Sequence, residues 1–155
     1  MIAFAKIMHI LAATIWVGGM FFAYVALRPA AVKLLEPEQR LPLWGQTLAT
    51  FFTWVWVAII MLPVTGFWMI FNLYQDMTAI GLHVHIMTLL GIVMILIFLA
   101  VFFIPYIQLR LAIMDEQYSK AATHLNWIRR GVLINLILGL VTIALGNAGA
   151  YLFHY

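Results

Sequence analysis

The stretch KIMHILAATIWVGGM, residues 6–20, places a histidine inside the first of four apolar runs that are long enough to cross a bilayer. An ionisable side chain in hydrocarbon is energetically costly, so a residue of this kind is a candidate functional residue by default. His9 is therefore the first functional candidate, and the apolar runs decide the fold.

The four apolar runs are defined by the charges that they lack. Lys, Arg, Asp and Glu are absent from residues 7–27, 41–75, 77–109 and 131–155. None of these runs alternates with period two, as the strands of a membrane barrel would. A spanning helix needs about 20 apolar residues, so we predict an all-α integral membrane four-helix bundle with helices at about 3–27, 47–72, 83–109 and 130–153. We interpret Pro42 and Gly45 as an interfacial lead-in to the second helix.

The composition sets the class of protein. Hydrophobic residues make up 66% of the chain and charged residues 8%. Soluble domains carry roughly 25% charged residues, so this chain cannot cover itself with a water-facing surface. We expect a single domain over residues 1–155, with the lipid bilayer as a partner, a homo-oligomer as an open alternative, and no nucleic-acid partner. The first run is longer than a signal-peptide core, so we expect it to be retained.

The basic residues are distributed unevenly between the two sides of the predicted bundle. Lys6 is the single Lys or Arg on the side of the amino terminus. Because cytoplasmic loops carry an excess of Lys and Arg, we predict that both termini are periplasmic and that the membrane is a bacterial inner membrane. The seven residues on the cytoplasmic side would be Arg28, Lys33, Arg40, Arg110, Lys120, Arg129 and Arg130.

Histidines converge on the periplasmic side in this topology. His9 lies about two turns into the first helix, and His83 and His85 open the third helix. Positions i and i+2 of a helix point roughly 200° apart, so His83 and His85 cannot both face the bundle centre. We expect His85, the deeper of the two, to face inward, and His83 to face the interface or to support a ligand residue. His154 lies near the same side, at the end of the fourth helix.

Copper is one candidate ligand for these side chains. The chain has no cysteine, which excludes disulfides and thiolate sites and leaves His and Met as soft or borderline ligands. We predict a copper site near the periplasmic face in which His9 and His85 are ligands and His83, Met8 and Met87 are auxiliary ligands. Further thioethers in or beside the apolar runs belong to Met20, Met69, Met77 and Met94.

Haem b is the alternative cofactor for the same histidines. Imidazoles on the first and third helices could ligate the two faces of the haem iron. Lys6 would then neutralise a haem propionate beside His9. Such a protein would be an oxidoreductase or an electron carrier, whereas a copper transporter would not be an enzyme. A scaffold subunit without a cofactor is a third alternative.

The first helix carries a family resemblance. The segment from His9 through Trp16 to Gly18 and Gly19 is similar to the first-helix signature of the copper-resistance protein D (CopD) family. The glycine pair gives the helix a bare surface that another helix or a flat ligand can approach closely. The resemblance implies an integral membrane protein that handles copper by transport across the inner membrane. It continues through Arg28-Pro29, Val84–Met87, Pro105-Tyr106, Leu109-Arg110, Ile128–Arg130 and Asn135.

A weaker resemblance is to HemJ-type protoporphyrinogen oxidase, which binds haem b. Lys6, His9, Trp16 and Gly19 match the start of its first helix. Its third helix has a lysine where this chain has His85, and the Glu and Pro of its fourth-helix motif are missing here. The resemblance implies a haem-binding membrane protein, and the lysine-to-histidine difference implies chemistry other than that of the oxidase.

Overall fold

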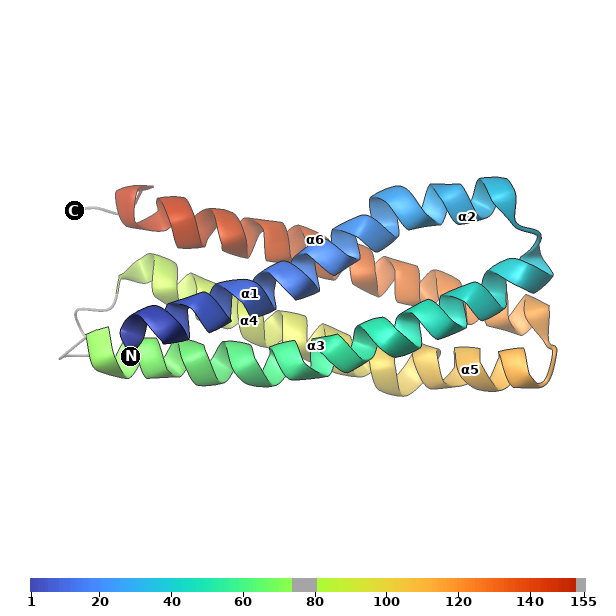
Figure 1. Cartoon of the computed structure of the whole chain (residues 1–155), viewed down its shortest axis with the longest axis horizontal. Coiled ribbons are helices and arrows are strands. Elements are labelled where there is room, and N and C mark those ends of the chain that lie inside the picture. Colours follow the sequence, from blue (N-terminus) through green and yellow to red (C-terminus); the bar gives the residue numbers. More distant parts are fainter. Residues whose placement is uncertain (74–80, 153–155) are drawn as a thin grey trace.

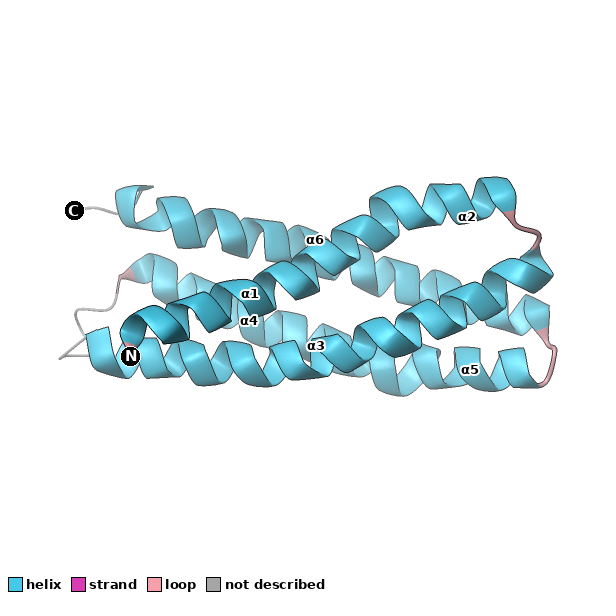
Figure 2. Cartoon of the chain, viewed as in Figure 1, coloured by secondary structure: helices cyan, strands magenta, loops and turns pink. Residues whose placement is uncertain are grey.

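A computed structural model describes residues 1–73 and 81–152 of the chain, and these residues are almost entirely helical (Figures 1 and 2). No strand occurs within the described ranges. Four rods in this part of the chain are long and apolar enough to cross a membrane, which confirms the predicted all-α bundle of membrane helices. The rods consist of α1 (Ile2–Phe21), η1 (Phe22–Leu27) and α2 (Arg28–Leu34); α3 (Pro37–Leu73); α4 (Leu82–Val101), η3 (Phe102–Tyr106) and α5 (Ile107–Met114); and α6 (Tyr118–Leu152).

The rods are longer than predicted at one end. The connections expected at 28–46 and 110–129 are helical except for residues 35–36 and 115–117, and the expected lead-in at Pro42 and Gly45 is part of α3. The boundaries were wrong because charged residues end the contact with hydrocarbon without ending the helix. Leu, Ala, Gln, Glu, Lys and Arg are all good helix formers in water.

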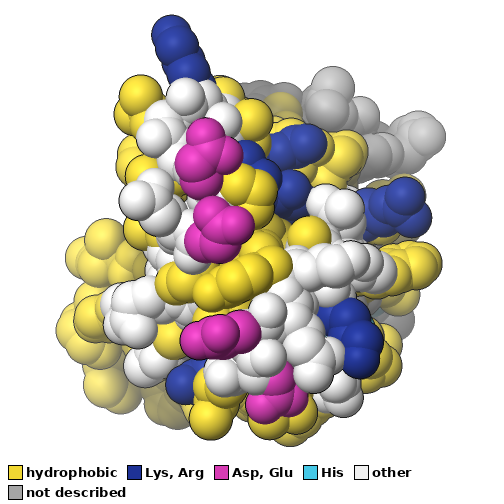
Figure 3. Space-filling view, turned by 90° about the vertical axis from the view of Figure 1, so that its right-hand side faces the viewer, with side chains coloured by type: hydrophobic (Ala, Val, Ile, Leu, Met, Phe, Trp, Pro, Cys, Tyr) yellow, Lys and Arg dark blue, Asp and Glu magenta, His cyan; other side chains and the backbone are white. Residues whose placement is uncertain are grey.

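The extra turns carry the bundle well beyond the hydrocarbon. The rods contain 33, 37, 33 and 35 residues. At 1.5 Å per residue each is about 50–55 Å long, against a hydrocarbon core of about 30 Å. Figure 3 looks onto the end formed by α2 and α5, where the Lys, Arg, Asp and Glu side chains gather. We call this the charged end.

The opposite end holds the beginning of α1, the last turns of α3, the beginning of α4 and the last turns of α6 (Figure 1). We call this the histidine end, because His9, His83 and His85 all lie in the helical turns nearest to it. The start of α1 and the end of α6 therefore lie at the same end of the bundle, as the predicted topology requires. The assignment of that side to the periplasm stays a prediction.

The helices pack as two pairs, α1 with α3 and α4 with α6, around an aromatic middle. Phe52 of α3 is 2% exposed, and its ring centroid lies 5.4 Å from that of Phe98 and 4.9 Å from that of Tyr106. Trp56 packs edge-on against Phe98 at 5.5 Å, and Trp16 of α1 does so at 6.3 Å. This aromatic layer separates the histidine end from the charged end.

Candidate functional site at the histidine end

A cavity of about 470 Å³ opens between α1, α3, α4 and α6 in the half of the bundle toward the histidine end. Most of its wall is aliphatic or aromatic, and four glycines form part of it. Its polar and sulfur-bearing wall residues are Lys6, His9, Trp16, Met69, His83, Met87, Thr88, Met94 and Thr142.

His9 is held in this wall by a hydrogen bond between helices. Its Nδ1 lies 2.8 Å from Oγ1 of Thr65 on α3, a residue that is 8% exposed. The Thr65 hydroxyl donates its own proton to the carbonyl oxygen of Met61, so its oxygen accepts the Nδ1–H of His9. That assignment leaves the Nε2 lone pair of a neutral His9 free to bind a ligand.

The space for the His9 ring comes from a glycine. A Cβ atom at Gly66 would lie 3.3 Å from Cε1 of His9, closer than most side-chain contacts. Thr65 and Gly66 thus act together, one anchoring the ring and the other making room for it. The sequence alone did not identify Thr65 as the partner of His9.

His83 is the second histidine on the cavity wall, and glycines leave space for it as well. A Cβ atom at Gly149 of α6 would lie 2.6 Å from Cβ of His83, and one at Gly81 would lie 2.6 Å from its Cε1. The ring is folded against these two bare backbones at the start of α4. Its Nδ1 is buried and has no hydrogen-bond partner among the described residues. A buried polar atom of this kind is a candidate ligand atom, because it lacks the partner that such atoms normally have.

His85 points the other way, so the predicted orientation of the two histidines was wrong. His85 is exposed and absent from the cavity wall, and its Nδ1 lies 3.4 Å from the carbonyl oxygen of Gly81. It shares a helix face with Leu89 and Leu96, which are 62% and 60% exposed. The inward face of α4 instead runs from His83 through Met87.

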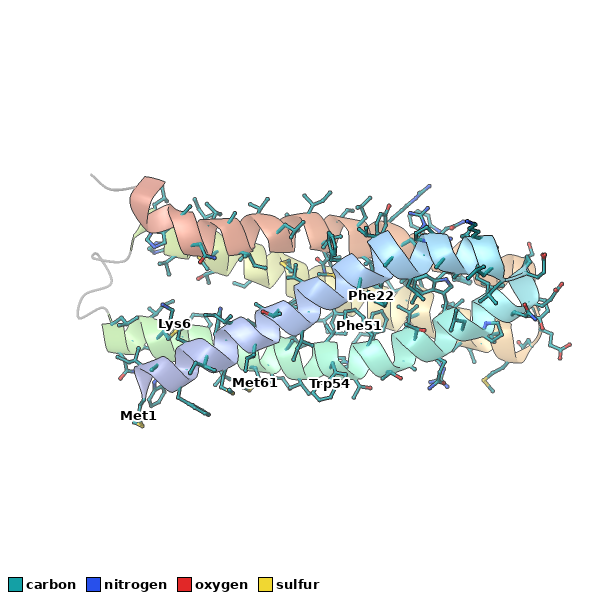
Figure 4. All side chains as sticks on the ribbon, turned by 45° about the horizontal axis from the view of Figure 1, so that its top comes forward. Met1, Lys6, Phe22, Phe51, Trp54 and Met61 are labelled. Carbon is teal, nitrogen blue, oxygen red and sulfur yellow. The ribbon has the colours of Figure 1, made fainter. Side chains whose placement is uncertain are left out.

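Some of the other predicted ligand residues line the cavity, and others do not. Met87 lies on the cavity wall, and its Cε is 3.1 Å from the position that a Cβ at Gly146 would take. Lys6 also lies on the wall, near the start of α1 (Figure 4), and its side chain is largely exposed. Met8 is half-buried but does not line the cavity. Met77 and His154 lie outside the described residues.

The cavity offers sulfur as well as imidazole ligands to a metal ion. Within residues 1–73 and 81–152 no three His, Cys, Asp or Glu side chains gather into a group that could hold a metal ion. Thioethers are present in addition, since Met69, Met87 and Met94 all line the cavity. Imidazole together with thioether is a donor set that suits cuprous copper.

A comparison with protein-family models matches residues 45–148 to the copper resistance protein D model. The chain belongs to the copper resistance protein D family. The match runs from α3 through α4 and α5 into α6, so it contains His83 and Met87 and begins after the first rod with His9. Neither the curated proteins nor the solved structures compared with the chain gave a match. Family membership identifies this CopD protein as a membrane protein related to copper resistance.

Proposed function

We propose that this CopD protein binds copper in the cavity at the histidine end and takes part in copper transport or homeostasis. The observation that carries the proposal is the shared wall on which His9, His83 and Met87 lie. Copper enters as the cargo of the protein, bound by Nε2 of His9, by the ring of His83 and by the thioether of Met87. His85 is replaced by His83 in this ligand set because of the direction in which each histidine points.

The site fits the binding of an ion from the side of the histidine end. Thr65 fixes the ring of His9 and its protonation state, which is the usual role of a residue that hydrogen-bonds a metal ligand. The wall is otherwise apolar, and a dry surrounding favours soft ligands over water for cuprous copper. With the positive-inside rule, the histidine end faces the periplasm of a bacterial inner membrane.

Passage of copper to the other side would require the bundle to rearrange. Phe52, Trp56 and Phe98 fill the middle of the bundle with rings that offer no ligand for an ion. Asn135 is the buried polar side chain at this level, and its Nδ2 donates to the carbonyl oxygen of Met94 at 3.1 Å. On this proposal, copper would bind from the histidine end, while the aromatic layer closes the bundle toward the charged end.

A cuprous-ion titration of the purified protein in detergent, against a chromogenic competing chelator, tests the copper site. His9→Ala and His83→Ala should each weaken binding by about a hundredfold or more, because removal of a ligand costs more than loss of a residue behind it. His85→Ala is the matched control, two residues along the same helix and of the same residue type, and should bind as the wild type does. Wild-type affinity in both cavity variants, or an equal loss in His85→Ala, would contradict the proposal.

Haem b is a second candidate, and the size of the cavity favours it. About 470 Å³ is within the range of small-molecule and cofactor pockets, roughly 300–1,000 Å³, and a single ion fills little of it. Gly91 adds open space on the wall, because a Cβ atom there would meet nothing within 4 Å. His9 and His83 would hold the iron, and Lys6 would pair with a propionate.

When bound, a haem would supply one-electron redox chemistry. The absorption spectrum of the protein purified from haem-replete cells, before and after dithionite, decides between the two candidates. A Soret band that His9→Ala abolishes and His85→Ala preserves would establish haem b and displace the copper site. A featureless spectrum, with cuprous binding that needs His9 and His83, would eliminate the haem.

A further inference from the structure

The cavity at the histidine end lies between the two helix pairs, with α1 and α3 on one side and α4 and α6 on the other. Phe67 of α3 and Ile92 of α4 both line it, yet they are 47% and 49% exposed. Exposed apolar side chains of membrane helices lie against lipid. Closer to the charged end, Trp56 of α3 packs on Phe98 of α4 and closes the gap between these helices. The cavity is therefore accessible from the hydrocarbon between α3 and α4.

Gly91 of α4 leaves open space on this side of the cavity. A Cβ atom at Gly91 would meet nothing within 4 Å, whereas one at Gly146 would lie 3.1 Å from Cε of Met87. Gly91 lies next to Ile92, one of the two exposed wall residues. The volume of about 470 Å³ suits a small organic molecule rather than an ion alone.

Two polar groups on the wall offer lone pairs to an occupant. The half-buried Thr88 of α4 donates its hydroxyl proton to the carbonyl oxygen of Val84 at 2.9 Å, which leaves its oxygen able to accept a hydrogen bond. His9 commits its Nδ1–H to Thr65 and keeps the lone pair of Nε2. Polar atoms in an apolar surrounding are normally paired, so an occupant that brings hydrogen-bond donors fits this wall.

These two acceptors lie at the same depth on opposite walls. His9 is seven residues beyond Ile2, and Thr88 is six residues beyond Leu82, which is about 10 Å along the helix in each case. They belong to different helix pairs. Packed helices are about 8–10 Å apart and an O–H···O contact is about 2.7 Å, so one hydroxyl group cannot reach both acceptors. The occupant needs two donors on opposite sides of a larger body.

We propose that the cavity binds a lipid-soluble quinol, an aromatic ring with two opposed hydroxyl groups and an apolar tail. One O–H donates to Nε2 of His9 and the other to Oγ1 of Thr88. The ring occupies the open space at Gly91, where the wall also offers the aromatic side chains of Trp16 and Phe67. The tail leaves between α3 and α4 into the hydrocarbon.

The quinol shares the cavity with the proposed copper site but does not depend on it. Copper would use the same lone pair of His9, so the two ligands would exclude one another at that atom. Thr88 and Gly91 are outside the copper ligand set. Quinol binding is therefore measured on copper-free protein, and a failure of the copper titration leaves this measurement unaffected.

The test uses the full chain, purified in detergent and kept under anaerobic conditions. Decylubiquinol and decylubiquinone are titrated separately, and native mass spectrometry records the bound fraction at each concentration. The quinone has the same tail and a ring of the same size but no O–H group to donate. The quinol should therefore bind roughly tenfold more tightly, as expected for two hydrogen bonds.

Two pairs of variants locate the ring. Gly91→Leu fills the open space and should weaken quinol binding by at least about tenfold. Gly18→Leu is its control, because a Cβ atom at Gly18 also meets nothing within 4 Å but Gly18 is not on the cavity wall. Thr88→Val keeps the side-chain shape, so it tests the site even if Gly91→Leu does not fold. It should weaken quinol binding by about fivefold, the effect of one hydrogen bond.

Thr14→Val is the control for Thr88→Val. Thr14 also bonds to its own helix, at the carbonyl oxygen of Ile10, but it is exposed and lies off the cavity wall. Tighter binding of the quinol than of the quinone, lost in Gly91→Leu and reduced in Thr88→Val, supports the proposal. Equal binding of quinol and quinone, equal losses in a variant and its control, or a Soret band that shows the cavity to be filled by haem would overturn it.

Discussion

At the scale of the residue, the informative contact is the one between His9 and Thr65. The sequence identified His9, because a histidine in an apolar run stands out against its neighbours. It did not identify Thr65, because a threonine in a membrane helix can bond to its own backbone and then carries no signal. Thr65 bonds to its own helix and also accepts from His9, and that second contact depends on the packing of α1 against α3.

Thr65→Val should weaken copper binding without unfolding the protein. Valine keeps the shape of threonine but cannot accept the Nδ1–H of His9, so the ring loses its fixed orientation. The expected loss of cuprous affinity is about tenfold, in the range found for residues that orient metal ligands. Thr142→Val is the control, because Thr142 lines the same cavity but its hydroxyl donates to the carbonyl oxygen of Leu138 on its own helix. Equal affinities in the two variants would contradict the role of Thr65.

His83 and His85 show what the sequence could not decide at this scale. A helix in water reveals its inward face through the spacing of apolar residues, but α4 is apolar on all sides. Depth along the helix was the remaining criterion, and it favoured His85. Packing places His83 on the inward face, because Gly81 and Gly149 leave space for its side chain. Gly149, in the last turns of α6, is the residue in the sequence that could have indicated His83 rather than His85 as the inward histidine.

At the scale of the element, the glycine pair of α1 shows how a predicted bare surface is used. A Cβ atom at Gly19 would run into the ring of Phe51 on α3, whereas one at Gly18 would meet nothing within 4 Å. Phe51 is labelled in Figure 4, on α3. The prediction that a neighbouring helix approaches this surface is confirmed for Gly19 and fails for Gly18. The difference follows from the rotation of 100° between adjacent residues.

Gly19→Ala should therefore destabilise the protein, and Gly18→Ala should not. Inserting a methyl group against the Phe51 ring should cost about 1–3 kcal/mol, as overpacking of a filled contact does. At Gly18 the methyl group meets open space, and alanine should add up to about 1 kcal/mol through its better helix propensity. Thermal unfolding in one detergent, followed by circular dichroism, measures both. Similar melting temperatures for the two variants would show that α1 and α3 do not pack as described.

The π-helical segments are the elements that the sequence did not reveal. Both η1 and η3 interrupt rods at the level where the aromatic layer ends and the charged end begins. Pro105 within η3 gives one of them a local cause, because proline removes a backbone donor from the helical ladder. Pro29, two residues after η1 (Phe22–Leu27), gives the other a local cause, because it cannot donate to the carbonyl oxygen of Val25 within that segment. The prolines are visible in the sequence, but their effect is not, because Pro42 and Pro63 lie inside α3 without a π-helical segment.

At the scale of the whole molecule, the bundle has a histidine end, an aromatic middle and a charged end. The number of helices followed from charge-free intervals, which hydrocarbon imposes directly on the sequence. The lengths of the rods did not follow from these intervals, because outside the hydrocarbon both charged and apolar residues can remain helical. Exposed Ser119 lies at the charged end, and exposed Asn72 lies at the last turn of α3, toward the histidine end.

Single cysteines at these positions test the orientation of the molecule in the membrane, since the natural chain has none. With the histidine end outside, Asn72→Cys should react with a membrane-impermeant maleimide in intact cells. Ser119→Cys should react only after the inner membrane is permeabilised. The labelled fractions are read from a gel-shift assay, with the cysteine-free protein as the blank. The reverse pattern would invert the topology and move the copper cavity to the cytoplasmic side.

The position of His9 also has an electrical consequence. His9 lies seven residues beyond Ile2, which is about 10 Å along the helix, or at most a third of a hydrocarbon core of about 30 Å. One elementary charge that crosses the full field gains about 2.3 kcal/mol per 100 mV. A monovalent ion that enters from outside and stops at His9 would gain at most about 0.8 kcal/mol, or roughly fourfold in affinity, per 100 mV. The larger share of the voltage would fall across the aromatic layer, so an inside-negative potential would act mainly on release. Binding measured on vesicles with and without a potassium diffusion potential should show that small change in affinity.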